Sequence, residues 1–144
     1  MRKTLGEAGL QSDDRRVLLV AQENSREYRL SNPARTRLLK YRVDGHWPQK
    51  KTTCDYAIGL PDKKRIILIE LKGKDIRHAA VQILDTIEYI STKKLDVEIH
   101  ARIVLSRVSR PDIRSSDVIR LEKELIKYKG DVKRASVLIE EQVW

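Results

Sequence analysis

A tight turn between two short apolar runs is the feature of this sequence that most restricts its fold. Residues 61–64 (Pro-Asp-Lys-Lys) separate the runs 56–60 and 66–69. Short apolar runs bounded by turn residues predict two strands of an antiparallel hairpin. In a symmetric hairpin, residues equally distant from the turn face each other. This register sets Asp55 directly opposite Glu70, with Cβ atoms about 4.5–5.5 Å apart.

Charged side chains at the open end of this hairpin need an explanation, because the strands are otherwise apolar. Lys72 lies two residues after Glu70 and therefore on the same face of its strand. Facing carboxylates repel each other, and a divalent cation would offset both charges. Hard oxygen ligands suit Mg²⁺ or Mn²⁺ rather than zinc. Such an ion, with Lys72 orienting a water molecule, is typical of phosphodiester hydrolysis.

A simpler interpretation is that Glu70 and Lys72 mark the point where the strand reaches solvent. The same acid-any-lysine spacing also occurs at Asp62 and at Asp131. Context separates the three occurrences. Only Glu70 follows a long apolar strand and has an aspartate, Asp55, at the mirrored hairpin position. The metal-site interpretation is therefore favoured.

The elements around the hairpin predict an α/β fold with a mixed sheet. Strands are expected at 36–43, 52–60 and 65–72, forming an antiparallel meander. A helix with Asp75 as N-cap follows, and its apolar residues recur at helical spacing: Ile76, Ala80, Ile83, Ile87 and Ile90. The alternation over 97–105 predicts a strand with one face in the core and Glu98, His100 and Arg102 on the other.

The two ends of the chain complete the expected order. A second amphipathic helix carries Val118, Leu121, Leu125 and Tyr128 and ends at Gly130. One last strand is expected over 133–143. Residues 12–28 are interpreted as a helix capped by Ser12, with a strand over 17–20 as the alternative. The order is then (α)βββαβαβ, with helices packed on the sheet.

Length and charge narrow the class of protein. The chain has 144 residues, enough for one domain, and a formal net charge of +9, which favours a polyanionic partner such as nucleic acid. Cys54 is the single cysteine, so an internal disulfide framework is excluded. No apolar run is long enough for a membrane span, and no signal peptide is recognised, so a cytoplasmic location and no membrane partner are expected.

The run from Cys54 through Leu84 resembles the core of the PD-(D/E)XK nuclease superfamily, which includes restriction endonucleases and Holliday-junction resolvases. Asp55 matches the aspartate of the second core strand, and Glu70 and Lys72 match the acid and lysine of the third. The resemblance covers residues 36–105. It implies a restriction-endonuclease-like αβββαβ core with a mixed central sheet, extended here by a C-terminal helix and strand, in one domain over residues 1–144.

The resemblance also implies roles for individual residues. Asp55, Glu70 and the backbone carbonyl of Leu71 would be the metal ligands, for Mg²⁺ or Mn²⁺, and Lys72 would serve the attacking water. Gln82 would contact the surroundings of Lys72 or the scissile phosphate, although a solvated helix face explains it equally well. For His78, on the same helix face, solvation is the favoured interpretation.

One part of the superfamily pattern has no clear counterpart. A further acid often precedes the meander, and the candidates left open are four residues: Glu7, Glu23, Glu27 and Asp44. Basic residues in two loops are candidates for phosphate contacts; they are Lys50, Lys51, Arg107, Arg110 and Arg114. His46 and Trp47 are interpreted either as base-stacking residues or as packing within their own turn.

The sequence therefore predicts a metal-dependent nuclease, with catalytic residues Asp55, Glu70, Lys72 and Gln82. DNA is favoured over RNA, and endonuclease over exonuclease action, on the family resemblance. A symmetric homodimer would place two sites on one duplex. The alternative is a non-catalytic nucleic-acid-binding or protein-interaction module that retains the nuclease fold.

Overall fold

The hairpin around the Pro-Asp-Lys-Lys turn forms in the predicted register. In the computed structural model, β5 (Tyr56–Leu60) pairs antiparallel with β6 (Arg65–Glu70), from Tyr56 opposite Ile69 to Leu60 opposite Arg65. The turn is a short 3-10 helix, η1 (Pro61–Lys63), and Lys64 closes it in the left-handed conformation with φ 48°. The symmetric closure expected from the sequence is confirmed over these five residue pairs.

The structure describes residues 1–48, 51–71, 75–106 and 115–144. Its larger sheet has six strands in the order β1-β4-β5-β6-β7-β8. The remaining members are β1 (Leu10–Asp14), β4 (Leu38–Arg42), β7 (Glu98–Leu105) and β8 (Val132–Ser136). Neighbours from β1 to β6 are antiparallel, whereas β6, β7 and β8 are parallel. The mixed sheet of parallel and antiparallel strands, predicted from the sequence as part of an α/β fold, is therefore present.

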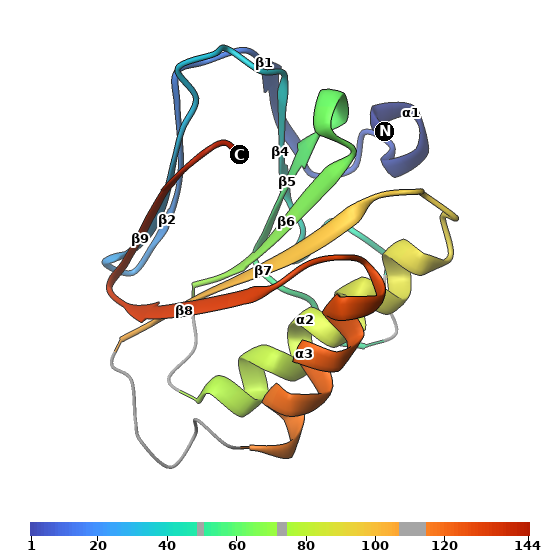
Figure 1. Ribbon diagram of the computed structural model, residues 1–144, viewed down its shortest axis with the longest axis vertical. Helices are drawn as coiled ribbons and strands as arrows, with labels where there is room; N and C mark the ends of the chain where they lie inside the picture. Colours follow the sequence, from blue (N-terminus) through green and yellow to red (C-terminus); the bar gives the residue numbers. More distant parts are fainter. Residues whose placement is uncertain (49–50, 72–74, 107–114) are drawn as a thin grey trace.

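Helices connect the parallel strands, because parallel neighbours are joined by a long crossover, which is usually helical. The crossover from β6 to β7 contains α2 (Ile76–Ser91), and that from β7 to β8 contains α3 (Ser116–Lys127). Both helices cover one face of the six-stranded sheet (Figure 1). In the described ranges, no helix has the length and apolarity to span a bilayer.

A second, three-stranded sheet covers the opposite face (Figure 1). Its order is β2-β3-β9, formed by β2 (Leu18–Glu23), β3 (Arg26–Ser31) and β9 (Leu138–Gln142). One apolar cluster therefore lies between the large sheet and the helices, and it includes Ala57, Leu68 and Ile83. Another lies between the two sheets, and it includes Tyr28, Ile58 and Ile67.

The expectation of a helix over residues 12–28 was wrong. The segment forms β1, β2 and β3, and the only helix before the meander in the described residues is α1 (Arg2–Leu5). Asn24 and Ser25 both have positive φ, 47° and 63°, and they join β2 to β3 as a two-residue hairpin turn. This turn matches the twist of antiparallel strands, and asparagine tolerates its backbone conformation.

The helix predicted after the hairpin is confirmed as α2. The Asp75 side chain caps it by accepting a hydrogen bond from the Arg77 backbone N–H at 2.9 Å. Its predicted apolar stripe is buried against the sheet, and the buried residues include Ile76, Ala79, Ala80, Ile83, Ile87 and Ile90. The helix thus lies across the face of the sheet from which Leu68 projects.

Strand β7 is buried on both faces, not on one as predicted. His100 and Arg102, expected to face solvent, are only 6% and 1% exposed. The three-stranded sheet covers this face, and charged partners accompany the burial. Arg102 donates hydrogen bonds to Asp131 Oδ1 and to Glu141 Oε1, and His100 Nδ1 lies 2.8 Å from Asp131 Oδ1.

The C-terminal segment forms two strands where the sequence indicated one. The chain leaves β8, turns at Val137 with φ 70°, and enters β9 in the other sheet. The Val137 N–H still donates to Leu105 O, while Val137 O accepts from Glu27 N–H. One residue therefore links the two sheets at the end of the molecule where β7 ends.

Candidate active site

The two predicted acids lie together at the open end of the β5–β6 hairpin. Glu70 is the last residue of β6, and Asp55 directly precedes β5. Both are buried, with exposures of 0% and 1%. The Asp55 backbone is fixed on both sides, because its N–H donates to Ile69 O at 3.0 Å and its carbonyl accepts from Val43 N–H at 2.9 Å.

The geometry at Asp55 departs from a simple continuation of the ladder. The regular register ends with Tyr56 opposite Ile69, yet Asp55 also bonds to Ile69. Two residues thus lie against one, as in a β-bulge. The Asp55 carboxylate accepts a hydrogen bond from Leu71 N–H at 2.7 Å, so it contacts the peptide unit that follows Glu70.

The extra residue also changes the side of the sheet on which Cys54 lies. Alternation along the strand predicts the Cys54 side chain on the face opposite Asp55, Ala57 and Gly59, but it packs in the cluster beneath α2 together with Ala57. Burial in the core is confirmed. Burial raises the pKa of the Cys54 thiol, and the negative charges of Glu70 and Asp55 raise it further. Both carboxylates therefore lie near enough to the buried thiol to disfavour its ionisation.

Polar side chains of α2 form hydrogen bonds with the backbone of the two residues before Asp55. Cys54 N–H donates to Thr86 Oγ1 at 3.0 Å, and Gln82 Nε2 donates to Thr53 O at 3.0 Å. Thr86 Oγ1 in turn donates to Gln82 O at 2.8 Å. Gln82 therefore holds the backbone before Asp55. Thr86 was not predicted, although its i+4 spacing from Gln82 placed it on the same helix face.

Several predicted residues lie outside the described part of the chain. Among them are Lys72, the expected catalytic lysine, and the basic residues Lys50, Arg107, Arg110 and Arg114. Their roles stay predictions. Lys51 is described, and its Nζ pairs with Glu88 Oε2 at 2.8 Å on the surface of α2.

The candidates for a third acid all pair with arginine side chains. Glu7 pairs with Arg2 at 2.9 Å, Glu23 and Asp44 with Arg42 at 3.3 and 3.5 Å, and Glu27 with Arg29 at 3.9 Å. Within the described ranges, no three side chains of His, Cys, Asp or Glu form a group that could hold a metal ion. At the end of the hairpin, the described groups that could serve as ligands are the side chains of Asp55 and Glu70 and the backbone carbonyl of Leu71.

The remaining histidine and aromatic candidates are resolved by their surroundings. His46 and His78 are exposed. Trp47 is 4% exposed and packs in the apolar cluster between the large sheet and the helices. The centroid of its ring lies 5.6 Å from that of Tyr41 and 5.4 Å from that of Tyr89. Packing, rather than base stacking, is thus the role that the structure gives to Trp47.

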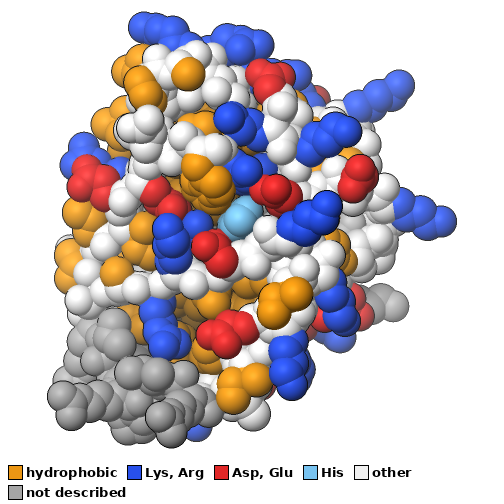
Figure 2. Space-filling model, viewed as in Figure 1, with side chains coloured by type: hydrophobic (Ala, Val, Ile, Leu, Met, Phe, Trp, Pro, Cys, Tyr) orange, Lys and Arg blue, Asp and Glu red, His pale blue; other side chains and the backbone are white. Residues whose placement is uncertain are grey.

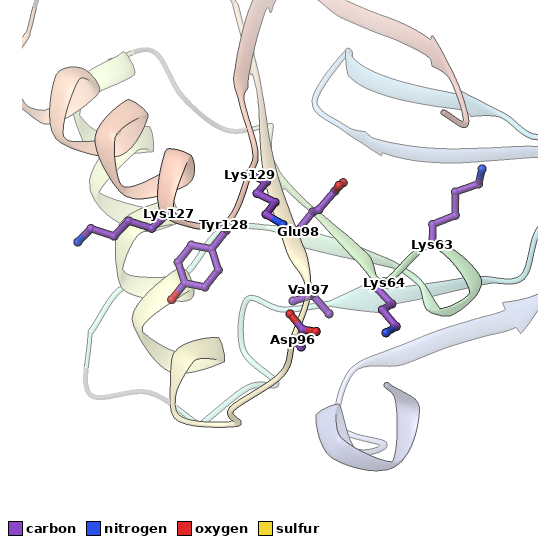
Figure 3. Close-up of a pocket in the computed structure, with 8 residues that line it drawn as sticks. All are labelled: Lys63, Lys64, Asp96, Val97, Glu98, Lys127, Tyr128 and Lys129. Atoms are coloured by element: carbon purple, nitrogen blue, oxygen red, sulfur yellow. The ribbon is translucent and has the colours of Figure 1, made fainter.

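A pocket at the other end of β6 contains none of the predicted catalytic residues. It has a volume of about 300 Å³ and lies where η1, β7 and the end of α3 meet (Figure 3). Its charged lining combines lysines and acids: Lys63, Lys64, Lys127, Lys129, Asp96 and Glu98. Across the face in Figure 2, basic side chains are likewise spread out, with acidic ones between them.

Comparison with known proteins finds no matching family model, no similar curated protein and no similar solved structure. What the chain does is therefore inferred from its own residues. The features available for this are the buried acids, their attachment to the backbone of Leu71, and the net positive charge of the chain.

Proposed function

We propose that this protein is a divalent-metal-dependent nuclease of the PD-(D/E)XK type, which hydrolyses phosphodiester bonds in nucleic acid, with DNA as the favoured substrate. One observation carries the proposal: Asp55 and Glu70 are both buried at the end of an otherwise apolar hairpin, and Asp55 is held on the peptide that follows Glu70. Buried charges are costly unless they are paired or coordinate a metal.

The residues fit a hard cation. Mg²⁺ typically keeps several water ligands and binds through one or two carboxylates together with substrate phosphates. The side chains of Asp55 and Glu70 and the carbonyl of Leu71 would hold such an ion. When bound, Mg²⁺ or Mn²⁺ polarises a phosphate oxygen and lowers the pKa of a coordinated water.

The other residues have supporting roles in this proposal. Lys72 orients the attacking water, a role that rests on the sequence pattern. Gln82 acts as a positioning residue, because its amide nitrogen is engaged by Thr53 O and not directed at a substrate. The Leu71 N–H fixes one carboxylate oxygen of Asp55.

The order of elements supports the same proposal. The meander β4–β5–β6, then α2 and β7, corresponds to the βββαβ part of the predicted core. The helix expected before the meander is replaced by strands β1 to β3 in the described residues. The likeness in order therefore begins at β4.

The test is cleavage of supercoiled and linear DNA with Mg²⁺ or Mn²⁺. Asp55→Asn and Glu70→Gln are expected to lower the cleavage rate at least about a hundredfold, as for loss of an electrostatic contact to the transition state. Asp62→Asn is the matched control, because Asp62 lies in the exposed turn of the same hairpin. If the wild type and all variants bind DNA and none of them cleaves it, the protein is instead the non-catalytic binding module.

A further inference from the structure

Arg26 is a buried arginine on the three-stranded sheet. It is the first residue of β3 and is 9% exposed. Its Nε atom is buried and has no hydrogen-bond partner within the part of the chain that the structure describes. Because leaving a charged donor unsatisfied is costly, such groups are rare in folded proteins and often mark the place of an ion or ligand.

The side chain of Arg26 faces the large sheet. Buried residues alternate along β3, and its neighbours on the buried side, Tyr28 and Leu30, lie in the core between the two sheets. The Nε atom of Arg29 also lacks a hydrogen-bond partner among the described residues, but Arg29 lies on the outer side of the strand, with 38% of its side chain exposed and its Nε 3.9 Å from Glu27 Oε2. Arg26 thus lies at the start of β3 on the side of the strand that faces the core between the sheets. The three-stranded sheet covers the face of the large sheet away from α2 and α3 (Figure 1).

A chain of contacts places Arg26 near the candidate active site. Arg26 pairs with Glu23 across the hairpin, so the two side chains share a face. Glu23 Oε2 lies 3.3 Å from Arg42 Nη1, and the Arg42 guanidinium lies 4.8 Å from the centre of the Tyr56 ring. Tyr56 is the residue that follows Asp55.

Lys40 is a second basic residue beside Tyr56. Lys40 Nζ lies 5.2 Å from the centre of the same Tyr56 ring and donates to Val20 O. Burial lowers the pKa of Lys40, and the positive charges of Arg16 and Arg42 lower it further. An anion bound beside Arg26 would supply acceptors for its guanidinium.

We infer that Arg26 binds a phosphate group, and that this phosphate belongs to the backbone of a nucleic acid that reaches the Asp55–Glu70 site. The second part rests on the proposed function. A guanidinium presents a planar fork of donors that matches phosphate oxygens, which explains an arginine at this position better than a lysine. Phosphate contacts of this kind fix the register of the substrate without reading its sequence.

The first experiment measures thermal unfolding with and without inorganic phosphate. Phosphate is expected to raise the Tm of the wild type and of Arg29→Gln, but not of Arg26→Met, because a ligand that binds only the folded state stabilises it. Equal shifts in all three proteins, or no shift in the wild type, overturn the inference. If Arg26→Met does not fold, Arg26→Lys replaces it: a reduced shift supports the inference, and an unchanged shift overturns it.

The second experiment measures duplex DNA binding in EDTA, where no metal-dependent cleavage occurs. Arg26→Met is expected to weaken binding about tenfold and to reduce the salt dependence by about one phosphate contact. Arg29→Gln is expected to change the affinity and the salt dependence less than Arg26→Met does. Unchanged DNA affinity in Arg26→Met, despite a lost phosphate effect on Tm, overturns the assignment to nucleic acid. If the wild type binds DNA through Arg26 but does not cleave it when Mg²⁺ or Mn²⁺ is added, this inference stands and the proposed nuclease activity is refuted.

Discussion

Leu71 donates its backbone N–H to Oδ2 of Asp55 over 2.7 Å. The bond joins the residue before β5 to the residue after β6, at the point where the regular ladder has already ended. It also sets the Asp55 carboxylate against the peptide unit that Glu70 shares with Leu71. The position of one predicted metal ligand is thus fixed by the backbone of another.

Replacing Asp55 separates its structural role from its proposed catalytic role. Asp55→Asn keeps an acceptor for Leu71 N–H and is expected to leave the free energy of unfolding nearly unchanged. Asp55→Ala leaves that buried donor unsatisfied, which costs about 1–3 kcal/mol. Urea unfolding of the two variants measures the difference, and equal stabilities would show that the bond to Leu71 contributes nothing.

Thr86 is expected to position Asp55 through the backbone of Cys54. Thr86→Val keeps the shape of the side chain but removes the acceptor of the Cys54 N–H, so it is expected to cost about 1–3 kcal/mol and to lower the cleavage rate. Thr86→Ser keeps the hydroxyl and should retain most of the rate. Unfolding and cleavage assays check both variants. A valine variant as active as the serine variant would remove Thr86 from the site.

Glu141 balances the buried guanidinium of Arg102. Arg102 is 1% exposed and donates to Glu141, which also accepts from the Tyr28 hydroxyl at 3.0 Å. Since Glu141→Gln leaves Asp131 as the acidic partner of the buried guanidinium, the substitution is expected to destabilise the fold by about 1–3 kcal/mol. Glu140→Gln, at the exposed neighbouring position, should change stability by less than about 0.5 kcal/mol. Similar losses in both variants would contradict this account.

Asp13 should make stability depend on pH in the acid range. Its hydrogen bonds from Arg37 and Arg2, both at 2.7 Å, hold the pKa of the carboxyl well below its usual value. A depressed folded-state pKa gives stability that is fully present above the unfolded value, near about 4, and is lost as the pH falls below it. Urea unfolding from pH 6 to pH 2 is expected to show a shallower decline for Asp13→Asn than for the wild type; parallel declines would contradict it.

The meander and the helix after it could be predicted because their signals are local. A turn between apolar runs set the register up to Tyr56 and Ile69, and the spacing of isoleucines set the buried face of α2. The bulge at Asp55 could not be predicted, because one added residue does not change the pattern of apolar residues in this segment. It is also the reason why Cys54 was placed on the wrong face.

The second sheet could not be predicted, because it depends on contacts between distant parts of the chain. Residues 17–20 form a short apolar run that suits a strand or a helix equally. The change of sheet at Val137 depends on a positive φ, which valine rarely adopts. Without this sheet, His100 and Arg102 were expected to face solvent.

The measurement that tests the central claim most directly is the binding of Mn²⁺, followed by electron paramagnetic resonance as free ion is lost. The wild type and Asp62→Asn are expected to bind one ion per chain at this site. Asp55→Asn and Glu70→Gln should each bind it at least about tenfold more weakly, because each removes one of the two carboxylates that the described residues place at this site. Equal Mn²⁺ binding by all four proteins would contradict the claim that Asp55 and Glu70 share a metal ion.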